Sequence, residues 1–160
     1  MYLNKKKVIF LISILALISF FIFNHFKPQE IRVVDGDTIY LNGEKIRFSG
    51  IDTPELKQTC INNETVDSCG ITAKEILIEK IANNKVECIS EGKDQYKRTL
   101  AECFVNNESL SSYLVRSGYA FAYRRYSKKF IVDEDYAKEK QAGMWAMKFE
   151  YPWDYRKKNN

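Results

Sequence analysis

The chain has 160 residues, enough for one domain of ordinary size, and carries 25 Lys and Arg against 21 Asp and Glu, a formal net charge of +4. Four of these lysines lie in residues 1–27, which contain no acid, so residues 28–160 hold 21 basic and 21 acidic residues. Such a neutral domain has no overall field that attracts polyanions, so affinity for a nucleic acid must come from locally placed arginines and lysines. The only histidine is His25, which excludes catalysis or metal binding through histidine in the rest of the chain.

The first predicted element is an apolar N-terminal helix. Lys5, Lys6 and Lys7 precede residues 8–23, sixteen positions without a charge. At about 1.5 Å per residue this run covers roughly 24 Å, which suits a short membrane span or a signal peptide. The basic flank predicts that the chain after residue 27 is exported. Because no small-residue cleavage site follows, an uncleaved anchor through residues 8–26 is favoured over a cleaved signal and a secreted product. A buried core helix fits poorly, because the run is apolar on all sides.

The rest of the sequence predicts an α+β domain. Five β-prone runs and three helical runs alternate with Gly-containing turns, in the order of three strands, a helix, two strands and two helices. This order is typical of a five-stranded Greek-key β-barrel of the oligonucleotide-binding type (OB-fold). We therefore divide the chain into the signal segment 1–27, the domain 28–149 and a C-terminal tail 150–160, whose aromatic cluster 151–156 has no assigned role. The predicted strands are 31–34, 38–41, 44–51, 85–90 and 99–105, and the predicted helices are 70–82, 109–116 and 131–142.

The four cysteines fit an exported domain. An even number of cysteines outside the cytoplasm indicates disulfides, and four allow three connectivities. Cys60 and Cys69 bracket a polar loop, whereas Cys88 and Cys103 lie in two runs that flank a turn. We predict the pairs Cys60–Cys69 and Cys88–Cys103, with four free thiols as the expectation for a cytosolic domain.

Acidic residues recur at two turns. Asp35-Gly36-Asp37 alone is typical of a polar turn, and the residues that follow it lack the ligands of an EF-hand. Gly50 allows a bend that brings Arg47 and Asp52 to one side of the chain. Asp37, Asp52 and Glu55 would then gather at one rim of the barrel, where a divalent cation would offset their repulsion.

Three blocks in this order resemble the staphylococcal nuclease (thermonuclease) family. They are residues 34–38 (VDGDT), 46–55 (IRFSGIDTPE) and 94–101 (DQYKRTLA), and residues 114–120 and 143–145 are similar to later helices of that family. The resemblance runs from about residue 31 to residue 145. The cysteines resemble those of an exported subgroup in which two disulfides replace a longer lysine-rich loop.

The resemblance implies a role for each matched position. Asp37, Asp52 and the backbone carbonyl of Thr53 would hold Ca²⁺, and Asp35 would support them without contacting the ion. Glu55 would activate or orient the attacking water. Arg47 and Arg98 would clamp the scissile phosphate and stabilise its developing charge. These implied site residues are Asp35, Asp37, Arg47, Asp52, Thr53, Glu55 and Arg98.

The implied substrate contacts depart from the family pattern. Lys97 stands where the family usually has glycine, and it either crowds the phosphate or adds a cation beside it. Gln95 replaces a lysine, whereas Tyr96 is retained. A tyrosine that stacks near the nucleotide corresponds to Tyr123, although a one-residue length difference leaves Arg124 as a competing alignment. The expected substrate contacts are Tyr96, Lys97 and Tyr123.

These observations predict a monomeric, Ca²⁺-dependent nuclease outside the cytoplasm. Its expected substrate is DNA or RNA, single-stranded in preference, cut to 3′-phosphorylated products. The alternative is a catalytically silent barrel that binds nucleic acid or a protein partner. The enzyme is favoured because all five implied metal-binding and catalytic side chains are present together.

Overall fold

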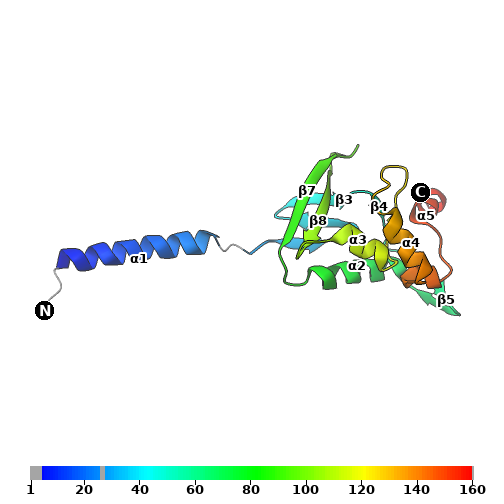
Figure 1. Ribbon diagram of the computed structural model, residues 1–160, viewed down its shortest axis with the longest axis horizontal. Helices are drawn as coiled ribbons and strands as arrows, with labels where there is room; N and C mark the ends of the chain where they lie inside the picture. Colours follow the sequence, from blue (N-terminus) through cyan, green and yellow to red (C-terminus); the bar gives the residue numbers. More distant parts are fainter. Residues whose placement is uncertain (1–4, 26–27, 160) are drawn as a thin grey trace.

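A computed structural model describes residues 5–25 and 28–159 of the chain. Helix α1 (Lys5–His25) lies apart from the folded domain in Figure 1. Within the described residues, no helix combines the length and apolarity that a membrane crossing requires.

The domain is built on a mixed sheet with the order β1-β2-β3-β8-β7 and with β9 paired to β8. β1, β2 and β3 form an antiparallel meander, β3 runs parallel to β8, and β7 is antiparallel to β8. The predicted strand boundaries at 38–41 and 99–105 are confirmed. The strands are β1 (Ile31–Val33), β2 (Thr38–Leu41), β3 (Glu44–Phe48), β7 (Val86–Lys93), β8 (Thr99–Val105) and β9 (Glu108–Ser109).

The prediction of a closed five-stranded barrel is wrong, because the sheet is open between β1 and β7. Gln29, just before β1, fills this gap with its side chain. Its Nε2 donates to the carbonyl of Val86 at 2.8 Å, and its Oε1 accepts from the backbone N–H of Val86 at 2.8 Å. One amide side chain thus satisfies both backbone groups of Val86 at this edge of the sheet.

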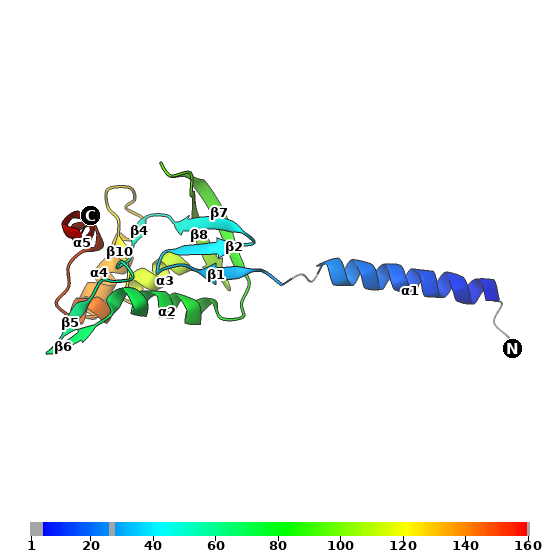
Figure 2. The same cartoon turned by 180° about the vertical axis from the view of Figure 1, so that it is seen from behind.

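The helices cover the sheet, and two of them complete its core. Ala73, Leu77 and Ile81 form the buried face of α2 (Cys69–Ile81), which falls within the predicted helix 70–82. They pack with Leu110 and Leu114 of α3 (Leu110–Arg116) against the strands (Figure 2). α4 (Ile131–Glu139) packs beside α3, and a short 3₁₀ turn, η1 (Gly143–Ala146), follows it.

Two short ladders extend the domain beyond the main sheet. β4 (Ile51–Asp52) pairs with β10 (Phe121–Ala122), and β5 (Cys60–Asn62) forms a hairpin with β6 (Thr65–Asp67). Both predicted disulfides are confirmed. Cys60–Cys69 joins β5 to the start of α2, and Cys88–Cys103 joins directly opposed positions of β7 and β8, with Cα atoms 5.9 and 4.0 Å apart.

The C-terminal segment packs on the domain around an aromatic cluster. Phe121 of β10 lies at its centre, with ring centroids of its neighbours 5.1–6.2 Å away. The segment ends in α5 (Pro152–Asn159), whose position beside β4 and β10 is visible in Figure 2. The neighbours of Phe121 are Trp145, Phe149, Tyr151 and Trp153.

The bridge across the open sheet predicts a cost for losing the Gln29 amide. Gln29→Ala leaves the N–H and C=O of Val86 without their partner, so we expect the free energy of unfolding to fall by about 1–3 kcal/mol. Urea unfolding of the full chain measures this change. Gln95→Ala, at an exposed loop position, is the matched control and should be near neutral. Equal stability of the two variants would contradict the bridging role.

Candidate functional site

The candidate site lies where β2, β3 and β4 meet. Asp37 immediately precedes β2, whose Thr38 pairs with Arg47 of β3. β3 ends at Phe48, and Gly50 turns the chain with a φ of +73° before Asp52 in β4. A Cβ at Gly50 would come within 3.0 Å of the Ser127 side chain, so this turn favours glycine for both conformation and space. The turn brings Arg47 and Asp52 together, as predicted.

Arg47 bridges two buried carboxylates. Its Nη1 donates to Asp37 Oδ1 at 2.8 Å, and its Nη2 donates to Asp52 Oδ1 at 2.8 Å. The exposed fraction is 2% for Asp37 and 0% for Asp52. Asp37 also accepts from the hydroxyl of Thr38 at 2.9 Å and from the backbone N–H of Thr53 at 3.3 Å. The guanidinium and these donors make burial of the acidic pair possible.

Burial is the main influence on the protonation of Asp37. Burial raises the pKa of Asp37 to about 7; Arg47 lowers it, and the nearby carboxylates of Asp35 and Asp52 raise it further. Burial alone would lower the pKa of Arg47, but Asp37 and Asp52 hold it above its ordinary value. A buried carboxyl with such a pKa is a site where further positive charge is favourable.

Asp35 supports the site through the backbone. Its Oδ1 accepts from the N–H of Asp37 at 3.1 Å, which fixes the turn that presents the Asp37 side chain. Gly36 between them leaves no room for a side chain, because a Cβ there would lie 2.9 Å from the hydroxyl of Thr53. The turn is therefore packed directly against the segment that follows β4.

Arg156 of α5 joins this site, and the sequence analysis did not identify it. Its Nη2 donates to Asp52 Oδ2 at 2.6 Å, and its Nη1 donates to Glu55 Oε1 at 2.8 Å and to Asp52 Oδ1 at 3.2 Å. Desolvation would lower the pKa of Arg156, but its hydrogen bonds to Asp52 and Glu55 keep it above the ordinary value. Arg156 lies 104 residues from Asp52, so no local sequence pattern links the two residues.

Arg98 immediately precedes β8, the strand that pairs with the strand of Arg47, but its side chain contacts other residues. β3 pairs with β8 so that Arg47 faces Leu100, two residues after Arg98. The Arg98 Nε donates to Asp94 Oδ2 at 2.6 Å, and its guanidinium lies 5.5 Å from the ring centroid of Tyr96. In this structure Arg98 therefore does not join Arg47 through a shared carboxylate.

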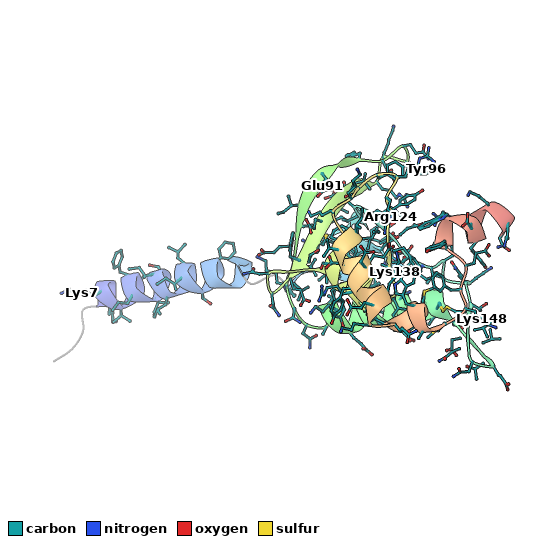
Figure 3. The ribbon with its side chains drawn as sticks, turned by 45° about the vertical axis from the view of Figure 1, so that its right-hand side comes forward. Lys7, Glu91, Tyr96, Arg124, Lys138 and Lys148 are labelled. Carbon is teal, nitrogen blue, oxygen red and sulfur yellow. A yellow bond between two sulfur atoms is a disulfide. The ribbon has the colours of Figure 1, made fainter. Side chains whose placement is uncertain are left out.

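Lys97 and Tyr96 occupy the turn between β7 and β8. Lys97 has a φ of +64°, the left-handed conformation that favours glycine. Tyr96 is 71% exposed and lies at the outer end of this hairpin in Figure 3. Their positions leave both side chains open to a ligand that approaches from solvent.

Tyr123 is placed by the C-terminal segment. Its ring stacks on Trp153 with centroids 5.7 Å apart and an interplanar angle of 12°, and Trp153 stacks in turn on Tyr151 at 4.6 Å and 10°. These rings line an open groove of about 620 Å³ together with the basic side chains of Arg124 and Lys138. Figure 3 shows Lys138 on α4 and Arg124 near it.

The donor chemistry fits a hard divalent cation, although the carboxylates are separated by arginines. Within residues 5–25 and 28–159, no three acidic, His or Cys side chains lie close enough to surround one ion. Arg47 instead links Asp37 to Asp52, and Arg156 links Asp52 to Glu55. Carboxylate oxygens such as those of Asp37 and Asp52 are the ligands that Ca²⁺ prefers.

Known proteins resemble this chain across the same region. The family described as "Staphylococcal nuclease homologue" matches residues 45–147. The chain is 35% identical to a thermonuclease of Staphylococcus intermedius over 125 residues, which cover 71% of the chain and 73% of that protein. It is 29% identical over 123 residues to a Haemophilus influenzae protein named "Uncharacterized endonuclease", covering 72% of the chain and 64% of the relative. The chain thus spans slightly less than two thirds of that relative's length.

The family match covers most of the sheet and its helices. It includes Arg47, Asp52, Glu55 and Arg98, and it ends before α5. The pairing of buried Asp52 with Arg47 lies within the matched region. The chain therefore belongs to the staphylococcal nuclease family.

Proposed function

We propose that this protein is a Ca²⁺-dependent nuclease that hydrolyses phosphodiester bonds of single-stranded DNA or RNA and leaves 3′-phosphorylated products. The observation that carries the proposal is the Arg47 bridge between the buried carboxylates of Asp37 and Asp52. Two relatives bear the names thermonuclease and endonuclease, which supports the same activity for this chain.

In this proposal the cation is held by the residues around Arg47. Asp37 and Asp52 supply carboxylate oxygens, Thr53 supplies its backbone carbonyl, and Asp35 fixes the Asp37 turn without direct contact. When bound, Ca²⁺ supplies positive charge beside the scissile phosphate. The raised pKa of Asp37 supports this role, because added positive charge would favour its ionised form.

The remaining steps belong to the side chains of the chain itself. Glu55 accepts a proton from, or orients, the water that attacks phosphorus. Arg47 and Arg98 donate to the phosphate oxygens, where negative charge develops in the transition state. Arg98 would exchange its hydrogen bond to Asp94 for the phosphate, a change within reach of its half-buried side chain.

Nucleic-acid binding would rely on aromatic and basic surfaces. Tyr96, Lys97 and Tyr123 are the proposed substrate contacts, and the groove beside Tyr123 combines stacked rings with Arg124 and Lys138, which both bond Glu134 in its wall. Unpaired bases expose faces that stack on such rings, which favours single strands over duplexes. We infer a monomer, because one chain supplies every residue that the proposed site needs.

We place the protein outside the cytoplasm. Cys60–Cys69 and Cys88–Cys103 are both formed, and disulfides of this kind persist in oxidising compartments. The two disulfides are the observation that supports a location outside the cytoplasm.

The catalytic proposal predicts a strict dependence on Glu55 and on the cation. The full chain should cut denatured DNA with millimolar Ca²⁺ and lose this activity in excess chelator. Glu55→Gln, which keeps the shape of the side chain but not its charge, should lower kcat by about 10²–10³. Glu64→Gln, in an exposed turn, is the matched control. Wild-type protein that fails to cut, or that cuts equally well in chelator, would show that the proposal is wrong.

The cation site also predicts a pH dependence of binding. The pKa of Asp37 is raised to about 7, so below this pH the carboxyl holds a proton that a cation must displace. We therefore expect the Ca²⁺ affinity to fall about tenfold between pH 8 and pH 6, because each bound ion must displace one proton from a carboxyl that is mostly ionised at pH 8 and mostly protonated at pH 6. Titration calorimetry at both pH values measures the change. An affinity that is constant over this range would contradict the role of Asp37.

A further inference from the structure

Arg156 contacts two carboxylates to which the proposed function gives different roles. It bonds Asp52, a proposed cation ligand, through both oxygens, and it bonds Glu55, the proposed water-activating residue, through one. We propose that Arg156 is a positioning residue of the active site, which holds Glu55 for catalysis and at the same time lowers the affinity of Asp52 for the cation. This inference rests on the proposed function.

The position of α5 makes these contacts a built feature of the fold. Trp153, three residues before Arg156, is stacked between Tyr123 and Tyr151. Pro152 at the start of the helix is buried, and the hydroxyl of Tyr155 donates to the backbone carbonyl of Lys57 at 3.4 Å. The helix is thus fixed to the domain on both sides of the site, and Arg156 extends from it toward Asp52.

Glu55 depends on the C-terminal segment for its orientation. It lies between β4 and β5, where the chain has no regular structure, and its side chain is 43% exposed. Its backbone N–H donates to Gln58 Oε1 at 3.2 Å, and Gln58 Nε2 donates to the carbonyl of Glu150 at 2.6 Å. Within the described part of the chain, the partner recorded for the Glu55 carboxylate is Arg156. Without Arg156 this carboxylate would be free to rotate into solvent.

The guanidinium of Arg156 competes with a bound cation for the carboxylate of Asp52. Asp52 is fully buried, its Oδ1 accepts from both Arg47 and Arg156, and its Oδ2 accepts from Arg156. A cation that takes an oxygen of Asp52 must lie beside Arg156 or displace it, and like charges at such short range repel. Removing the charge of Arg156 should therefore strengthen cation binding while weakening catalysis.

The two effects of Arg156 have opposite signs. We expect Arg156→Gln to bind Ca²⁺ about tenfold more tightly than the wild type, and to lower kcat about tenfold with little change in KM. Arg156→Lys keeps the charge but not the two-pronged bridge, so it should restore the wild-type Ca²⁺ affinity and only part of kcat. A helix that came loose would also carry this charge away from Asp52, so the wild-type Ca²⁺ affinity of Arg156→Lys is the result that separates positioning from loss of the helix.

The experiment titrates Ca²⁺ into the chelator-stripped full chain by calorimetry and measures nuclease kinetics on the same samples. Lys158→Gln is the control, because it removes one charge from the same helix at an exposed side chain that bonds the carboxylate of Glu150. A Ca²⁺ affinity of Arg156→Gln that equals or falls below that of the wild type would overturn the proposal.

A double-mutant cycle tests the link to Glu55 independently of cation binding. In the Glu55→Gln background, Arg156→Gln should cause no further loss of kcat, because its target is already absent. Additive losses would overturn the positioning role. If the wild type neither binds Ca²⁺ nor cuts DNA, the proposed function fails. If the wild type does both and Arg156→Gln has the same Ca²⁺ affinity and kcat as the wild type, only the role of Arg156 fails.

Discussion

The site depends on keeping two buried carboxylates close together. Asp37 and Asp52 are almost fully inaccessible, and burial of ionised carboxylates is costly unless opposite charge and hydrogen bonds compensate. Arg47 supplies that charge by bonding both, although burial still raises the pKa of Asp37 to about 7. The local architecture follows from this constraint, since three strand segments must deliver three side chains to one point.

The sequence predicts the local half of this arrangement well. The β2 and β8 boundaries, the bend at Gly50 and both disulfides depend on patterns within about twenty residues, where periodicity and turn chemistry are informative. The contact between Arg47 and Asp52 follows from the same bend at Gly50. These features were predictable because short-range geometry determines them.

The features that could not be predicted are long-range. Gln29 meets Val86 across 57 residues, at the place where the sheet is open and a barrel was expected. Arg156 meets Asp52 across 104 residues, from a segment whose composition indicates only that it is aromatic and basic. Neither contact leaves a repeat, spacing or hydrophobic period in the sequence, because a single polar side chain makes each of them.

The C-terminal segment couples the stability of the domain to its chemistry. The aromatic cluster around Phe121 holds α5, β10 pairs Phe121 with Asp52, and Gln58 ties the Glu55 backbone to Glu150. Any change that loosens this cluster therefore reaches the carboxylates through the backbone as well as through Arg156. Thermodynamic linkage also acts in the opposite direction. If a ligand binds the carboxylates only when α5 is packed against the domain, its binding stabilises that packing. The last helix of the chain is in this sense a structural part of the site.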